Sequence, residues 1–398
     1  MTPFRRLWLA QTISLLGDFL AVFAVQIAVT FRMHGSARQV SGVFIAGLLP
    51  GILFGPLAGA WADRWDPRRT MVTSDAVRAG LVLLLPWAQQ LPQIYAISFA
   101  MGCVACVFGP ALSITIPLLV PREELGTSIA RLQQSMQVMR IASPTLAAAL
   151  AASFGERVCY YADSASFLFS ACTVASLRYS RMKCPANAPS RMGEGFRFLA
   201  ADARFRFVML ALTLGIFAGS CFGALAAVYV RDTLQRGPAV LGLISSLIGA
   251  ATVVGSVLMG RLMRGRDPKA LVAMGITGVG ASILTFAVLS SEAGAYLASI
   301  AMGFGVATVM PAATVLLQGQ APAELRGRIS GATAALTSLA QLSGMLFAGW
   351  WAAWIGVRGV FGASAGLLLL TGVIAGRDSR RPLASAHAGD SRPVPGGN

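Results

Sequence analysis

Long apolar stretches recur from one end of the chain to the other, and short polar breaks separate them. A helix needs about 20 mostly apolar residues to cross the hydrocarbon core of a bilayer. Only 12% of the 398 residues are charged, whereas soluble globular domains carry roughly 25%. The chain has too little polar surface to cover itself in water, so we predict an all-α integral membrane protein.

Twelve stretches have the length and composition of a spanning helix. They cover residues 7–31, 41–62, 71–90, 93–119, 127–153, 159–177, 205–230, 239–261, 270–290, 294–317, 328–352 and 357–376. The breaks at 89–93, 290–294 and 354–358 are the shortest. The first stretch is too long for the core of a signal peptide and has no clear cleavage site, so we interpret it as a retained span.

The lysines and arginines predict the orientation of these spans. If the N-terminus lies in the cytoplasm, most of the 32 basic residues fall in cytoplasmic segments. The outer loops then hold only Arg32, Arg38, Arg157, Arg231, Arg236 and Arg358. This bias is the one that the positive-inside rule describes, and it favours both termini in the cytoplasm. The net charge of +16 is therefore explained by the orientation of the spans in the membrane. The sequence has no basic face with interleaved aromatic residues that would indicate a nucleic-acid partner.

A polar, basic break divides the chain into two similar halves. We predict an N-terminal half at 1–177, a cytoplasmic linker at 178–204, a C-terminal half at 205–376 and a disordered tail at 377–398. At one fixed offset, residues of the first half recur at equivalent points of the second. The pairs include Gly59 with Gly260, Asp66-Pro67 with Asp267-Pro268, Pro110 with Pro311, and Gly126 with Gly327. Six spans in each half preserve orientation, so the halves are expected to be parallel repeats.

The break after the second span resembles the signature loop of the major facilitator superfamily, Gly-x-x-x-Asp-Arg-x-Gly-Arg-Arg/Lys. The matching residues are Gly59, Asp63, Arg64, Arg68 and Arg69, while Asp66 and Pro67 depart from the pattern. A carboxylate such as Asp63 can face the positive N-terminus of another helix, and the arginines can bind lipid phosphates. The alternative is that the basic residues only anchor the topology.

Other segments resemble the drug and siderophore exporters of that superfamily, such as macrolide-efflux-like and enterobactin-exporter-like permeases. Ser143 and Pro144 stand in an element similar to the exporter pattern Gly-Pro-x-x-Gly-Gly, although an ordinary proline kink explains them nearly as well. Similar phrases surround Asp18, Asp75, Glu123, Asp163 and Glu324. The resemblance implies two six-helix halves around a central cavity, in the inner membrane of a bacterium.

Ionisable residues inside spans are the strongest functional candidates, because charge at membrane depth is costly. Asp18 and Arg140 fall near the middle of their spans, and Asp18 is the only carboxylate that we place there. Asp75 and Arg78 are spaced i,i+3, which allows a local and structural ion pair. Gln11, Gln26 and Gln134 either line the same cavity or form hydrogen bonds between helices. We expect Asp18 to alternate between a proton and a partner, either Arg140 or the substrate.

Several other patterns carry no chemistry in this interpretation. Cys103 and Cys106 have CxxC spacing but lie in an apolar helix without a second pair. His34 and His387 are the only histidines, so a zinc site is not expected. Neither a nucleotide-binding loop nor a cofactor motif is present.

We therefore expect a secondary transporter that exports an amphipathic small molecule, such as a drug or siderophore, in exchange for protons. Its partners would be the substrate, protons and membrane lipids, and it would act as a monomer. The alternatives are an uptake permease or a lipid flippase of the same fold. An intramembrane enzyme or a receptor is a rival of another class, but an enzyme would need clustered catalytic groups at one depth.

Overall fold

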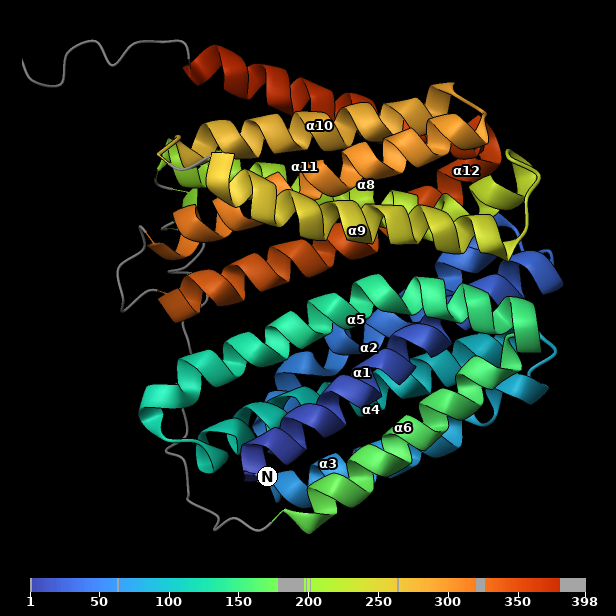
Figure 1. Cartoon of the computed structure of the whole chain (residues 1–398), viewed down its shortest axis with the longest axis vertical. Helices are drawn as coiled ribbons and strands as arrows, with labels where there is room; N and C mark the ends of the chain where they lie inside the picture. The colour runs from blue at the N-terminus through green and yellow to red at the C-terminus, as the bar shows by residue number, and fades with distance from the viewer. Residues whose placement is uncertain are drawn as a thin grey trace, which may run out of the picture.

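The computed structural model describes residues 2–62, 64–177, 197, 199–200, 202–262, 265–319 and 326–379. Long helices make up most of this part of the chain (Figure 1). The first half holds α1 (Pro3–Ile27), α2 (Ala37–Ala62), α3 (Pro67–Val82), α4 (Leu91–Leu119), α5 (Leu125–Phe154) and α6 (Arg157–Ser176). The second half holds α8 (Ala203–Asp232), α9 (Pro238–Leu262), α10 (Pro268–Val288), α11 (Glu292–Gly319) and α12 (Arg326–Ser379).

The helices follow the predicted spans closely. In the C-terminal helix α12, Gly356 has non-helical backbone angles, with φ at 73°, and divides the helix within the predicted break at 354–358. A positive φ costs glycine little, which explains why the chain can turn there. α12 continues to Ser379, into the segment predicted as a disordered tail, and residues 380–398 lie outside the described part. Most of the predicted linker also lies outside it.

Eight of the described helices are long and apolar enough to cross a membrane. α3, α5 and α6 do not meet that standard of length and composition. α3 has 16 residues and carries Asp75 and Arg78, and α6 carries Asp163. Two of these three helices, α3 and α6, thus hold buried charged residues.

The repeated Asp-Pro pairs have the same structural role in both halves. Asp66 precedes α3 and accepts a hydrogen bond from the backbone N–H of Arg69 at 3.0 Å. Asp267 precedes α10 and accepts one from the N–H of Lys269 at 3.1 Å. In each case proline occupies the first helical position, where its missing N–H costs nothing. The departure from the signature loop therefore provides a helix cap.

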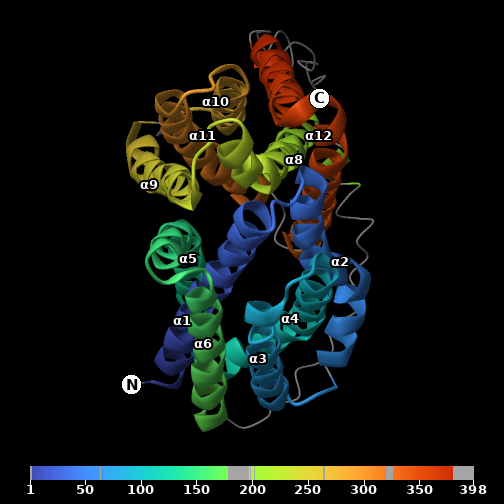
Figure 2. The ribbon, with the colours of Figure 1, turned by 90° about the vertical axis from the view of Figure 1, so that its right-hand side faces the viewer.

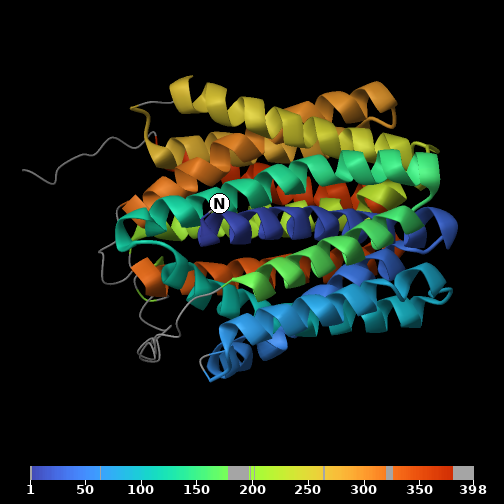
Figure 3. The ribbon, with the colours of Figure 1, turned by 60° about the horizontal axis from the view of Figure 1, so that its bottom comes forward.

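Each half is a bundle, and the two bundles lie one above the other in Figure 2. In the first, α1 packs on α5 and α6, and α3 packs on α4 and α6. Between the halves, α2 contacts α12 and α5 contacts α9. The helices run roughly alongside one another in the view of Figure 3. This layout puts α1, α2 and α5 next to the second half, while α3 and α6 lie farther from it.

The halves meet near the end of the bundle where α8 is followed by α9. There Arg231 of α8 donates hydrogen bonds to the carbonyl oxygens of Thr30 and Gly35. Farther along, a Cβ built on Gly242 or Gly249 of α9 would lie 2.3 Å from a side-chain atom of α5. In Figure 1, α5 and α9 approach each other toward this end and diverge toward the end that carries the N-terminus. Close helix approach at small residues thus holds one end together.

Candidate functional site: a buried carboxylate–arginine cluster

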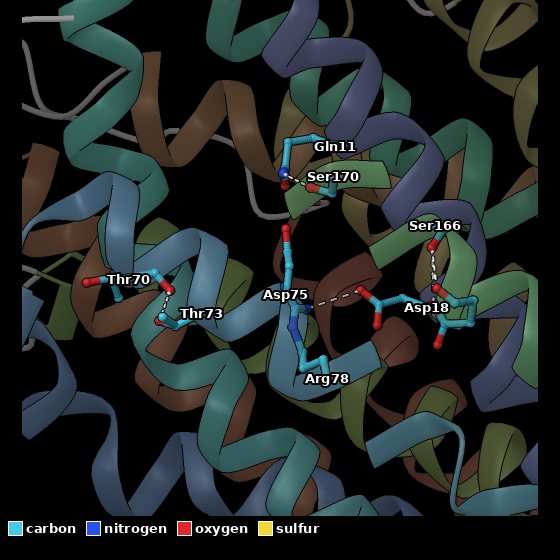
Figure 4. A network of polar contacts seen from close by, with 9 residues as sticks. Gln11, Asp18, Thr70, Thr73, Asp75, Arg78, Ser166 and Ser170 are labelled. Carbon is cyan, nitrogen blue, oxygen red and sulfur yellow. Dashed lines mark hydrogen bonds and ion pairs between the residues drawn. The ribbon is translucent and has the colours of Figure 1, made fainter. Parts of the chain in front are cut away.

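Three carboxyl groups and one guanidinium group meet inside the first half. The carboxylate–arginine cluster consists of Asp18 on α1, Asp75 and Arg78 on α3, and Asp163 on α6. Figure 4 shows Asp18, Asp75 and Arg78 facing one another, with Ser166 beside Asp18. The helices that contribute these residues are in direct contact, since α6 packs against both α1 and α3.

Arg78 is the fixed centre of the cluster. Its Nη2 donates to Oδ1 of Asp75 at 2.5 Å, which confirms the predicted i,i+3 pair. Its guanidinium carbon lies 4.5 Å from the ring centre of Phe108 and 4.3 Å from that of Phe167. Aromatic faces attract a cation more strongly where water is excluded, and the side chain of Arg78 is 7% exposed. Arg78 is therefore held in place without the help of Asp18.

Asp18 is bound to Arg78 more weakly than Asp75 is, and its side chain is more exposed. Its Oδ2 lies 3.5 Å from Nη1 of Arg78, a distance at the long end for an ion pair. Its side chain is 33% exposed, whereas that of Asp75 is fully buried. Asp18 can exchange a proton or a partner while Asp75 and the two aromatic rings keep Arg78 in place. It is the most exposed member of the cluster.

Close packing of α1 against α6 brings Asp163 into the cluster. A Cβ on Gly17 would lie 2.6 Å from Oδ1 of Asp163 and 2.9 Å from its Cα. Only glycine fits here, because a methyl group would overlap the backbone of α6. On the same seam, Nε2 of Gln11 donates to Oγ of Ser170 at 3.3 Å. Ser164 extends the seam to α3 by donating to the carbonyl oxygen of Ala79 at 3.1 Å.

The expectation that Asp18 pairs with Arg140 does not describe this conformation. Asp18 forms its ion pair with Arg78, and the side chain of Arg140 is exposed. The buried residues of α5 are Ser128, Ser135, Ser143, Ala147 and Ala148, which follow one stripe of the helix. Arg140 lies off this stripe. The expectation that Asp18 is the only carboxylate at its depth is also wrong, because Asp163 packs against its neighbour Gly17.

Two of the three candidate glutamines form hydrogen bonds between helices, which is one of the two roles predicted for them. Gln11 joins α1 to α6. Gln26 is buried, and its Nε2 donates to the carbonyl oxygen of Gly223 on α8 at 2.9 Å, so it joins the halves. Gln134 is exposed on α5. The first two therefore have a structural role in this conformation.

The exporter-like element lies where α5 meets α9. Oγ of Ser143 donates to the carbonyl oxygen of Met139 at 2.6 Å. The carbonyl oxygen of Pro144 lies 3.4 Å from the Cβ position of Gly242, and Ala148 packs still closer to that glycine. The proline thus stands in the contact between the halves.

A family model of the Major Facilitator Superfamily matches residues 7–342 and, in a second match, residues 208–394. The chain belongs to this superfamily. Among its relatives, the MFS-type transporter YfiS of Bacillus subtilis is 26% identical over 92% of this chain and 90% of its own. Macrolide efflux protein A of Streptococcus pyogenes is 26% identical over 93% of this chain and 94% of its own.

A solved structure supports the same fold. The nucleoside transporter NupG (D323A mutant) aligns with a TM-score of 0.77 at 10% identity, covering 94% of this chain and 99% of its own. At that identity the likeness concerns the fold alone. This major facilitator chain is a multi-pass membrane transporter with efflux proteins among its relatives, and it is not an enzyme.

The superfamily's signature loop lies between α2 and α3. Gly59 is within α2, Arg64 and Arg69 are exposed, and Arg68 is half-buried. Asp63 lies outside the described residues, so its docking on a helix terminus stays a prediction. The rings of Trp61 and Trp65 stack across the turn, 6.0 Å apart. Aromatic and basic residues together are typical of the membrane interface.

No role for Asp163, Ser166, Phe108 or Phe167 was predicted from the sequence. An acid in the apolar stretch 159–177 is a usable signal for Asp163. The two phenylalanines give no such signal, because apolar spans contain many aromatic residues. Among the described residues, no group of three or more His, Cys, Asp or Glu could hold a metal ion.

Proposed function

We propose that this transporter exports an amphipathic small molecule across the inner membrane of a bacterium in exchange for protons. Both termini lie in the cytoplasm in this proposal, as the basic residues predict. The end at which the halves meet then faces outward, and the conformation receives substrate from the cytoplasm. The protein acts as a monomer, because each chain contains both halves.

The observation that carries the proposal is that the two ion pairs of Arg78 differ in length and in burial. The inner pair with Asp75 is short and buried, and the outer pair with Asp18 is long and partly exposed. A carboxylate at membrane depth is costly when it is charged and unpaired. When Asp18 leaves Arg78, it therefore takes up a proton or meets a cationic group of the substrate. Competition between proton and substrate for one carboxylate is the requirement for exchange.

The names of the relatives favour export over uptake as the direction of transport. Macrolide efflux protein A is similar over nearly the whole chain, and the segments around Asp18 and Asp75 resemble exporters. A macrolide is an amphipathic molecule of the class proposed here. An uptake permease or a lipid flippase would use the same fold, and the direction of movement separates these alternatives from export.

Transport into inside-out vesicles tests the proposal. Asp18→Asn should abolish accumulation of radiolabelled erythromycin driven by a pH gradient, while exchange of the drug down its own gradient continues. Glu123→Gln, which removes an exposed acid at the N-terminal end of α5, is the matched control and should accumulate the drug normally. Accumulation only in right-side-out vesicles would indicate uptake.

A static Asp18–Arg78 pair is the structural alternative. In that case Asp18→Asn should lower the folded yield and slow both kinds of movement equally. Full gradient-driven accumulation by Asp18→Asn would contradict both interpretations.

A further inference from the structure

Asp163 is a buried carboxyl group that has no cation of its own among the described residues. Its side chain is fully buried on α6. The charged groups that face it are Asp18 from α1 and Asp75 and Arg78 from α3. Arg78 already binds Asp75 and lies next to Asp18. One cation thus stands against three carboxyl groups, and a second uncompensated negative charge at this depth would be very costly.

The hydrogen bonds around Asp163 indicate where a proton resides. The Ser166 hydroxyl has a single hydrogen and donates it to the backbone carbonyl oxygen of Asp163 at 2.7 Å. The same hydroxyl oxygen lies 3.3 Å from Oδ1 of Asp163. The hydroxyl is in donor position toward both oxygens, but its single hydrogen fits the shorter bond to the backbone better, which leaves a lone pair that can accept from Oδ1. A protonated Oδ1 can donate to that lone pair, whereas an ionised one would face it without a hydrogen.

The second carboxyl oxygen gives the same indication. Oδ2 of Asp163 is buried and has no hydrogen-bond partner among the described residues. An ionised carboxylate has four acceptor sites, and this environment would leave nearly all of them empty. A neutral carboxylic acid has less need of donors, so its burial here costs much less.

We propose that Asp163 is a second proton-binding residue of the transport cycle, which holds a proton in this conformation and exchanges it with Asp18. In the exchange the O–H bond of Asp163 breaks and one forms on the carboxyl group of Asp18. The negative charge moves to Asp163, and the total charge of the cluster is unchanged. Gly17 makes the two groups neighbours by letting α1 approach α6 closely. This inference rests on the proposed coupling at Asp18 and adds the residue that stores the proton.

Infrared spectroscopy of the purified, substrate-free protein tests the storage of the proton. The wild type at neutral pH should show the carbonyl absorption of a protonated carboxyl group, and Asp163→Asn should lose it. The amide of the new side chain keeps an N–H that can donate to Ser166, so the variant is expected to fold. Glu123→Gln should retain the band. A wild type without the band, or Asp163→Asn with the band intact, would overturn the proposal.

A second variant keeps the test decisive if Asp163→Asn folds poorly. Ser166→Ala removes the acceptor of the proposed hydrogen bond without a change in charge, so the carbonyl band should shift in frequency. An unshifted band would contradict the assigned bond. In inside-out vesicles, Asp163→Asn should lower the number of protons exchanged for each erythromycin. An unchanged ratio would show that Asp163 only holds α6 against α1. Since the infrared test needs no transport, its outcome is independent of the result for Asp18→Asn.

Discussion

Loss of the Arg231 side chain should favour the outward-open conformation. Arg231 lies at the end of α8, and its Nη1 donates to the carbonyl oxygens of Thr30 and Gly35 at 2.6 and 2.9 Å. Thr30 belongs to η1 (Ala28–Arg32), a π-helical turn that follows α1. In this turn the carbonyls of Ala28 and Val29 accept from the N–H groups of residues 33 and 35. The Thr30 carbonyl is directed to Arg231, which thereby ties the first half to the second.

The size of the effect follows from these two bonds. Hydrogen bonds to charged groups contribute about 1.5–3 kcal/mol each. The Arg231 side chain is 18% exposed, so water replaces part of what is lost. We therefore take about 2 kcal/mol for the two bonds together, which corresponds to roughly a 30-fold change in the ratio of open to closed protein. The bonds to Asp232 stay within α8 and do not enter this figure.

Labelling of a buried cysteine at the outer end measures this ratio. Ser41 on α2 is fully buried and lies against Gly349 of α12, in the other half. With Ser41→Cys as the reporter, Arg231→Gln should raise the rate of labelling by a membrane-impermeant maleimide from outside roughly 30-fold. Peptide mass spectrometry at residue 41 separates this reaction from labelling of native cysteines.

Two arginines at the same end provide matched controls. Arg236 pairs with Glu292 inside the second half, and Arg32 pairs with Glu156 inside the first half at 2.6 Å. Arg236→Gln and Arg32→Gln remove the same charge without a bond between the halves, so the labelling rate should stay near that of the parent. An unchanged rate in Arg231→Gln, or equal increases in all three variants, would refute the reasoning.

Three further outcomes are expected. Gly17→Ala should destabilise the purified protein by about 1–3 kcal/mol, as expected for an overpacked site, because the new Cβ would lie 2.9 Å from the Cα of a residue on α6. Gly80→Ala is the control and should leave the thermal stability unchanged, because the space around its Cβ is open. Asp63→Asn should impair erythromycin export without loss of protein from the membrane, and normal export would reduce the signature loop to a topology anchor. Reporter fusions at Gly237 and Arg191 should report outside and inside respectively, and the same side for both would show that the span layout is wrong.

The sequence was sufficient for features that depend on one helix at a time. Apolar length predicted the helices, and Gly356 interrupts α12 within the predicted break at 354–358. The i,i+3 spacing predicted the Asp75–Arg78 pair, because neighbouring turns of one helix bring such residues together. The Asp-Pro repeats were visible in the sequence, and their role as helix caps follows from the known preferences of both residue types.

The sequence was not sufficient for features that depend on which helix faces which. Asp18 and Arg140 have similar depth, but depth does not give the face of the helix, and Arg140 is exposed. The partner of Asp18 comes from α3 because both α1 and α3 pack on α6. The burial of Asp163 likewise depends on Gly17, a small residue whose close contact with another helix becomes visible only in the fold.

The helix α1 connects the proposed proton site to the contact between the halves at Arg231. Gly17 and Asp18 lie against α6 and Arg78 in the middle of the bundle. About two turns later on the same helix, Gln26 donates to α8, and the π-helical turn beyond it accepts from Arg231. A shift of α1 that separates Asp18 from Arg78 also moves the groups that bind α8, because the helix between them is continuous. In the proposed cycle, protonation of Asp18 removes its attraction to Arg78, so the step that loads the proton also weakens the restraint on α1. One helix can therefore couple the state of a carboxyl group to the closure of the outer end without a longer chain of contacts.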